Sequence, residues 1–258
     1  MRRVTRVFVP VLFGAAFFGA WEALVRGLDL KPYFLVAPST IAEQFGSSWS
    51  LVWRSMKVSG GNALAGLLIG TGLGIAVSLV TSRFRLLHEL VTPLAVALNA
   101  IPIFVLVSVF NNMFAITSEV PRRLMVTLVV YFVVLVNVTR GLVQVDRLHM
   151  ELMRSYAASD WQVLRRVRIP NAVPYLFTAL KIAAPVAVIT AFVSEYFGGS
   201  QNGLGSAIAR SIAASRNDQA WAYVAGACLL GLTFYLISTL LETVATPGGA
   251  GKRPAGRS

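Results

Sequence analysis

Long runs of apolar residues alternate with short polar segments along the chain. A helix needs about 20 largely apolar residues to cross the hydrocarbon core of a bilayer, and six runs are of about that length. The pattern predicts an all-α integral membrane protein, because a helix satisfies its own backbone hydrogen bonds in lipid. The six predicted transmembrane helices cover about residues 7–25, 63–80, 87–110, 124–142, 173–197 and 220–242.

The first apolar run follows Arg2, Arg3 and Arg6 and has the outline of a secretory signal peptide. It is long for the apolar part of such a signal, and no Ala-x-Ala cleavage pattern follows it. We therefore expect residues 1–26 to form an N-terminal tail and a retained first span.

Residues 27–61 are of mixed polarity and are interrupted by prolines. They predict an external interfacial segment that holds one short amphipathic helix, beginning near Ser39. The other five spans then form a core over residues 62–245. The glycine-rich tail at 246–258 lacks the first glycine and the Ser/Thr of a phosphate-binding loop, and we expect it to be disordered and cytoplasmic.

Small residues and prolines indicate how the spans pack. Stripes of small residues let helix backbones approach closely in lipid, although chance repeats in a chain rich in Ala and Gly are the alternative. Pro93 and Pro102 predict kinks in the third span, because neighbouring groups can satisfy the carbonyls that a proline leaves free. The stripes are Gly66, Gly70 and Gly74 in the second span and Ala183, Ala187 and Ala191 in the fifth.

The composition excludes a soluble fold. Only 13% of the residues are charged and 56% are hydrophobic, whereas soluble domains carry about 25% charged residues. The net charge of +12 comes from basic residues that lie between apolar runs rather than on one amphipathic face. This distribution argues against a nucleic-acid partner and for basic cytoplasmic loops.

The distribution of Lys and Arg predicts the orientation. With the N-terminus inside, fourteen of these residues fall in cytoplasmic segments and eight in external ones. Because cytoplasmic loops carry the excess of basic residues, both termini are predicted to be cytoplasmic. Arg122 and Arg123 fall on the external side, against the rule.

No catalytic or metal-binding constellation is visible. Cys228, His88 and His149 stand far apart, without metal-ligand spacing. Two alternatives to a transport subunit are an integral membrane enzyme and a secondary transporter. The first usually shows clustered His, Asp or Glu at one membrane face, and the second internal repeats with broken helices. Neither pattern is found.

The loop at 144–171 is the one long cytoplasmic segment between spans, and it predicts two short helices with a turn between them. Ser159 is a good N-cap for the second, with Gln162 three residues later in a capping-box pattern. Trp161 begins its apolar stripe, and Pro170 is expected to end it before the fifth span. The stripe either lies among lipid headgroups or docks onto a cytoplasmic protein.

This loop resembles the signature of permease subunits of ABC importers, E-A-A-x3-G-x9-I-x-L-P. The sequence aligns without gaps as Glu151-Leu152-Met153, Ala157 and Val167-Arg168-Ile169-Pro170. Ala37-Pro38-Ser39, Ile101-Pro102, Glu195 and Gly203-Leu204-Gly205 are similar to the nitrate, sulfonate and taurine branch of that family. The main departure is Ala157 in place of glycine, because alanine is strained at a positive φ angle.

The resemblance implies the type I importer permease fold, with six transmembrane helices and a cytoplasmic coupling helix, in a bacterial inner membrane. It implies two copies of a separate ATPase that bind ATP and magnesium, an external solute-binding protein and a second permease chain, identical or different. This chain would hold no cofactor of its own. The coupling surface would comprise Glu151, Ala157, Ser159, Asp160, Trp161 and Pro170.

The solute pathway is less well defined by the sequence. Asn99, Pro102 and Glu195 are possible pathway or gate residues, Glu195 because it resembles an acidic residue beside the family's outer gate. Lys181 cannot pair with Glu195, since fourteen residues separate them by about 21 Å along a helix. The solute is expected to be a small anion, such as a sulfonate, nitrate or taurine-like compound, or a vitamin precursor.

Overall fold

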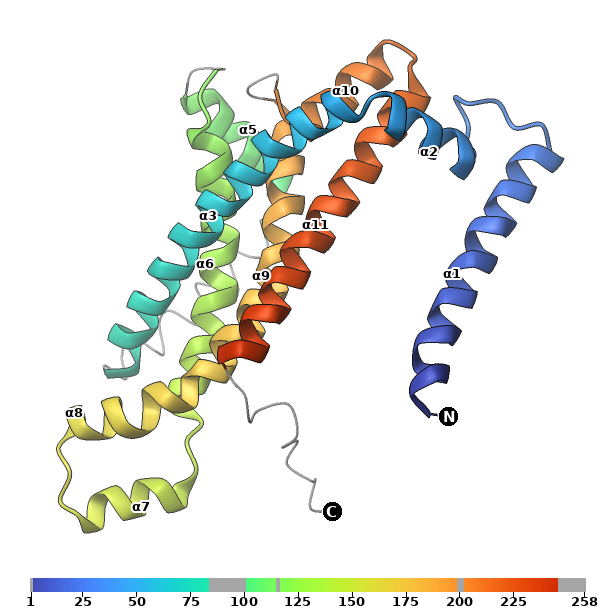
Figure 1. Cartoon of the computed structure of the whole chain (residues 1–258). Coiled ribbons are helices and arrows are strands. Elements are labelled where there is room, and N and C mark those ends of the chain that lie inside the picture. Colours follow the sequence, from blue (N-terminus) through green and yellow to red (C-terminus); the bar gives the residue numbers. More distant parts are fainter. Residues whose placement is uncertain (1, 84–100, 115–116, 199–201, 246–258) are drawn as a thin grey trace.

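The computed structural model describes residues 2–83, 101–114, 117–198 and 202–245, and within these ranges every regular element is a helix (Figure 1). Among the described residues, five helical segments are long and apolar enough to cross a membrane. The predicted span at 87–110 lies largely outside the described residues, and its end is seen as the short helix α5 (Ile103–Met113). The five segments are Phe8–Gly27, Trp49–Arg83, Val120–Val143, Asp160–Tyr196 and Asn217–Ala245.

Four long helices form the bundle: α3 (Trp49–Arg83), α6 (Val120–Val143), α9 (Ile169–Tyr196) and α11 (Asn217–Ala245). Helix α6 packs against both α3 and α9, and α11 packs against α9 (Figure 1). The core between them is built mainly of valines and alanines, which allow close packing without long side chains.

The glycine stripe of α3 lies directly against α6. A Cβ placed on Gly66 would lie 2.4 Å from Cβ of Val126, and one on Gly74 would lie 2.8 Å from Cβ of Val134. A Cβ on Gly70 would lie 2.7 Å from the carbonyl oxygen of Thr127. The predicted packing role of this stripe is therefore confirmed, because no larger residue fits at this helix contact.

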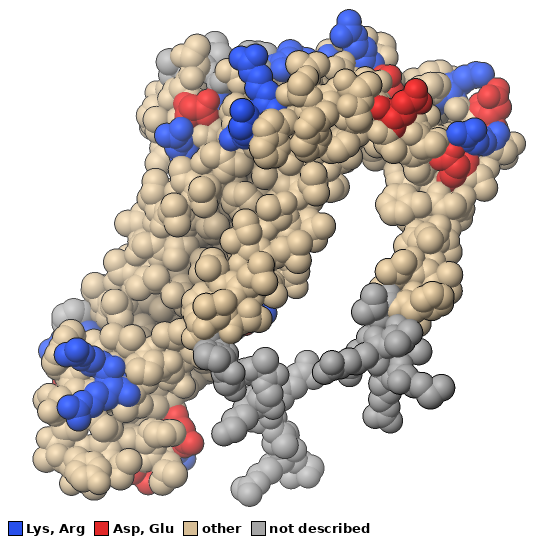
Figure 2. All heavy atoms as spheres, in the orientation of Figure 1, with Lys and Arg blue, Asp and Glu red and all other residues tan. Residues whose placement is uncertain are grey.

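The bundle has two polar ends and an apolar middle. Helices α2 (Pro38–Ser47) and α10 (Leu204–Ala213) lie at one end, which we call the far end (Figure 1). Helices α7 (Arg147–Ser155) and α8 (Asp160–Val163) lie at the other, which we call the loop end. Figure 2 shows charged side chains at both ends and an almost uncharged surface between them, as a bilayer requires.

Helix α1 (Arg2–Gly27) stands apart from the bundle and joins it at the far end (Figure 1). The carboxylate of Glu22 accepts hydrogen bonds from the backbone N–H of Ser39 (3.0 Å) and from its Oγ (2.7 Å). Because Ser39 lies in the first turn of α2, this anion sits where a helix favours negative charge. The rings of Trp21 and Trp221 meet edge to face beside it, 5.6 Å apart.

Two boundaries differ from the sequence prediction. Helix α3 begins at Trp49, so it runs through much of the segment that was predicted to be interfacial. Pro102 lies outside a helix, as the residue before α5, and so does not kink a continuous span. The short helix predicted near Ser39 is confirmed as α2, whereas α10 was not predicted at all.

Candidate functional site

Both helices of the loop end are capped by side chains. Asp146 Oδ1 accepts the backbone N–H of Leu148 at the start of α7. Ser159 Oγ accepts the backbone N–H of Gln162, while Gln162 Oε1 accepts the backbone N–H of Ser159 at 2.9 Å. The predicted capping box is thus confirmed, and each helix has a defined beginning.

The turn that ends α7 requires a left-handed residue at position 157. The backbone N–H of Ala157 donates to the carbonyl of Arg154 (2.9 Å), and that of Ala158 donates to the carbonyl of Met153 (3.0 Å). These two bonds form a Schellman motif, which needs a positive φ at the residue after the C-cap. Ala157 adopts φ +49°, so the motif forms here with an alanine at the strained position.

The residues predicted to form the coupling surface are all exposed on this loop: Glu151, Ala157, Ser159, Asp160, Trp161 and Pro170. Large apolar side chains accompany them, with Trp161 61% exposed and Tyr156 74% exposed. Exposed apolar side chains that cluster on a polar surface mark an interaction site. Their role in coupling stays a prediction.

The sequence predicts that Pro170 ends the second loop helix, and this prediction is wrong. Helix α8 continues through a π-helical turn, η1 (Leu164–Arg168), into α9, with Pro170 in the first turn of α9. The backbone N–H of Ile169 donates to the carbonyl of Leu164, five residues back. This wider turn accommodates a proline ring that would clash with the preceding turn of a regular α-helix.

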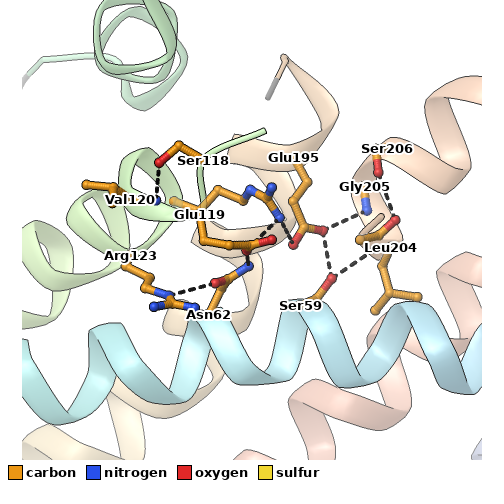
Figure 3. A network of polar contacts seen from close by, with 12 residues as sticks. Ser59, Asn62, Ser118, Glu119, Val120, Arg123, Glu195, Leu204, Gly205 and Ser206 are labelled. Carbon is orange, nitrogen blue, oxygen red and sulfur yellow. Dashed lines mark hydrogen bonds and ion pairs between the residues drawn. The ribbon is translucent and has the colours of Figure 1, made fainter. Parts of the chain in front are cut away.

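At the far end, Glu195 is the centre of a buried ionic network (Figure 3). Its Oε2 accepts a hydrogen bond from Ser59 Oγ (2.6 Å) and another from the backbone N–H of Gly205 (3.1 Å). Its Oε1 lies 3.6 Å from Nη1 of Arg122. The network therefore joins α3, α6, α9 and the start of α10 through one carboxylate.

Arg122 and its neighbours extend the network toward the surface. Nη1 of Arg122 also lies 3.1 Å from Oε2 of Glu119, and this oxygen accepts a hydrogen bond from Asn62 Nδ2. Arg123 Nε donates to Asn62 Oδ1 at 3.0 Å. Arg122 thus pairs with both carboxylates, as a buried charge requires, whereas the hydrogen bond of the exposed Arg123 goes to the amide of Asn62. Arg122, which falls against the positive-inside rule, is fully buried and paired.

The Gly203-Leu204-Gly205 segment fits closely against Glu195. A Cβ on Gly203 would lie 2.1 Å from the carboxyl group of Glu195, and one on Gly205 would lie 2.1 Å from the carbonyl oxygen of Phe192. The backbone N–H of Leu204 donates to Ser59 Oγ at 2.9 Å. Glycine is needed here because backbone and carboxylate approach without room for a side chain.

Several polar contacts were missed by sequence reasoning. The sequence excludes a pair between Lys181 and Glu195 but does not indicate another partner. In the structure, Lys181 Nζ lies 2.6 Å from Oε2 of Glu242 on α11. No sequence pattern indicates a role for Ser59 or Asn62. The one indication for Glu119 is its position three residues before Arg122, at the start of α6. Of the possible pathway residues, Asn99 lies outside the described residues.

Comparisons with known proteins identify similar membrane components of transport systems. Residues 66–248 match the model of the family "Binding-protein-dependent transport system inner membrane component". The chain is 29% identical to the formylaminopyrimidine transport permease protein ThiX of Halalkalibacterium halodurans, over 96% of this chain and 98% of that protein. It is 28% identical to the riboflavin transport system permease protein RibX of Chloroflexus aurantiacus, over 86% of this chain and 83% of that protein.

A solved structure shows the same fold. A chain of the inward-facing MetNI methionine ABC transporter superposes with a TM-score of 0.59, covering 77% of this chain and 94% of that one, at 17% sequence identity. At this identity, the likeness concerns the fold alone.

Proposed function

This chain belongs to the family of binding-protein-dependent transport system inner membrane components, and we propose that it carries a heteroaromatic vitamin precursor into the cell under the drive of a separate ATPase. The chain itself is a multi-pass permease of an ABC importer, a class of subunit that is not catalytic in itself. The proposal has two parts, the coupling to an ATPase and the class of solute.

The exposed, doubly capped α7–α8 loop is the observation that carries the coupling. Its apolar side chains, Trp161 and Tyr156 among them, would be covered by a groove on an ATPase subunit that binds ATP and magnesium. Caps at both helix starts and the Schellman turn hold the loop in one shape, which lowers the ordering cost of docking.

Continuity between the loop and the bundle supports a mechanical connection. The segment Asp160–Tyr196 is helical over 37 residues, which corresponds to about 55 Å. A displacement of α8 by an ATPase would therefore reach the far end, where Glu195 ties α9 to α3 and α10. The π turn η1 is the one place along this segment where the hydrogen-bond register changes.

The remaining partners follow from the family. We propose two ATPase copies, a second permease chain that is identical or different, and an external solute-binding protein. The loop end would face the cytoplasm of a bacterial cell and the far end the outside. The pairing of Arg122 supports this orientation. Because Arg122 is held inside the ionic network, it does not count as an external loop charge against the positive-inside rule.

For the solute, the names of these two relatives support a heterocycle, since formylaminopyrimidine and riboflavin both contain one. Aromatic side chains at the far end between α5 and α9 are consistent with this class. The rings of Phe104 and Phe197 lie 6.4 Å apart and those of Tyr196 and Phe197 5.3 Å apart, and Phe104 and Phe197 are more than half exposed. Such faces stack favourably on flat heterocycles.

One experiment tests the coupling. Trp161→Glu should abolish co-purification of the ATPase and uptake in proteoliposomes, because the substitution puts a charge into an apolar contact. Tyr33→Glu, at an aromatic near the far end that is 80% exposed, is the control and should leave both unchanged. Normal ATPase binding by the Trp161→Glu chain would contradict the proposal.

A second experiment tests the solute. Titration calorimetry of the cognate external binding protein with formylaminopyrimidine, riboflavin, taurine and nitrate should show heat only with a heterocycle. The same order should appear when each compound competes for uptake through the reconstituted complex. Binding of taurine or nitrate without binding of any heterocycle would restore the small-anion interpretation and reject the one proposed here.

A further inference from the structure

A cavity of about 340 Å³ lies at the loop end, where the end of α3 meets α7, α8 and η1. Sites of a few hundred cubic ångströms are large enough for small ligands. Its charged lining residues are three arginines and a single aspartate, and the three arginines come from three different elements. They are Arg83 from α3, Arg154 from α7, Arg168 from η1 and Asp160 from α8.

None of these arginines forms an ion pair with any residue that the structure describes. Within the described part of the chain, their one hydrogen bond is from Arg168 Nη1 to the carbonyl oxygen of Ser82, at 3.4 Å. In contrast, the far-end Arg122 has two carboxylates within 4 Å. Figure 2 shows basic side chains gathered at the loop end of the molecule. The cavity therefore has excess positive charge and guanidinium donors that are not used within the fold.

We propose that this cavity binds the phosphodiester headgroup of an anionic phospholipid. Arginine suits a phosphate group, because its planar fork donates two parallel hydrogen bonds to two oxygens. The position also fits a lipid, since Arg83 lies at the loop end of the described part of the membrane-spanning helix α3, and basic residues next to a membrane span attract anionic headgroups. The remaining walls include Met150, Val163 and Leu164, which suit a glycerol backbone and the first methylenes.

A lipid held here would link the end of α3 to both helices of the loop. The loop is continuous with α6 and α9, and the hydrogen bond from Arg168 to Ser82 links it to α3. An additional contact would restrict its motion relative to α3 further. This role goes beyond the proposed function, because it requires neither a particular solute nor an ATPase for the binding itself. The consequence is a permease whose loop is more ordered in an anionic membrane.

The test uses the full-length chain, purified in detergent, and phosphatidylglycerol as the probe. Native mass spectrometry measures the retained lipid, and thermal unfolding measures its stabilising effect. Arg154→Gln and Arg168→Gln should each weaken retention about fivefold. One basic residue near the membrane surface strengthens binding of an anionic lipid by about that factor. Arg165→Gln, in the same π turn but outside the cavity lining, should change nothing.

A gain of binding separates the proposal from simple misfolding. Asp160→Asn removes the only carboxylate among the described lining residues and should strengthen retention of phosphatidylglycerol severalfold. The proposal is overturned if phosphatidylcholine is retained equally well, or if inorganic phosphate displaces the lipid and stabilises the chain by itself. It is also overturned if the arginine variants release the ATPase while they keep the lipid, because the cavity would then belong to a protein contact.

Discussion

The two polar ends of the molecule differ in the burial and pairing of their charged side chains and in the exposure of their aromatic ones. At the far end, Glu195 and Arg122 are almost completely buried and have partners within the chain. At the loop end, Trp161 and Tyr156 are exposed, and the arginines around them are not paired among the described residues. The ionic groups of the far-end network pair within the chain, whereas the arginines of the loop-end cavity have no ion-pair partner among the described residues.

The difference shows what each kind of residue reports in a membrane protein. A buried charge costs several kcal/mol unless it is paired, so its presence implies partners in the same fold. An exposed tryptophan on a polar segment implies a partner outside the fold. Substitutions of the buried ionic groups at the far end should therefore change stability, and substitutions of the exposed aromatic side chains at the loop end should change association.

The largest effect is expected from Glu195→Ala. The substitution removes the acceptor of Ser59 and Gly205 and leaves buried Arg122 with Glu119 alone. Loss of one partner of a buried pair destabilises by about 3–5 kcal/mol. Thermal unfolding in detergent measures this, with exposed Glu151→Ala as the control, which should change stability by less than about 0.5 kcal/mol. Equal midpoints for the two variants would mean that the far-end network is not structural.

The next effect concerns the close approach at Gly205. A methyl group there meets the backbone carbonyl of Phe192, which cannot rotate away, so Gly205→Ala should destabilise by about 1–3 kcal/mol. Gly61→Ala is the matched control, because a Cβ at that position in α3 meets nothing within 4 Å. Since alanine favours a helix over glycine, the control should be neutral or slightly stabilising. Thermal unfolding measures both variants. A neutral Gly205→Ala would contradict the close approach described here.

A gain of stability is expected at the loop end from Ala157→Gly. Alanine at φ +49° costs about 1 kcal/mol that glycine avoids, so the substitution should stabilise the turn by about that amount. Amide hydrogen exchange of the Ala157 and Ala158 N–H groups should slow severalfold. Ala158→Gly, one residue later and without a positive φ, should show no such gain. Faster exchange in the Ala157→Gly chain would contradict the Schellman assignment.

Local features of the sequence predicted local structure well. The cap at Ser159, the strained position at Ala157 and the start of α2 depend on residues within one turn of each other. Pro170 misled the boundary of the second loop helix, because proline is allowed in a first helical turn and the π turn before it makes room for its ring. Helix α3 was placed too late because its first turns contain Arg54 and Lys57, which an apolar-run criterion rejects.

The far-end network could not be predicted in the same way. Ser59 and Glu195 are 136 positions apart, and no periodicity connects them. Glu195 and the two glycines after it were identified by family resemblance, but their contact with each other required the fold. Arg122 was counted as an external loop charge because its burial depends on α3 and α9 closing over it.

The smallest effect is expected from the ion pair between Lys181 and Glu242. Its burial is intermediate between that of the far-end network and that of the exposed loop end. The pair joins α9 to α11, but its side chains are 30% and 25% exposed, so part of its strength is lost to screening. Lys181→Met should change the free energy of unfolding by at most about 1 kcal/mol, since the apolar stem is kept. The matched substitution Arg122→Met should cost several times more, because it leaves Glu195 buried without a cation. If the two variants unfolded at the same temperature, burial would not be what distinguishes the far end from the rest of the molecule.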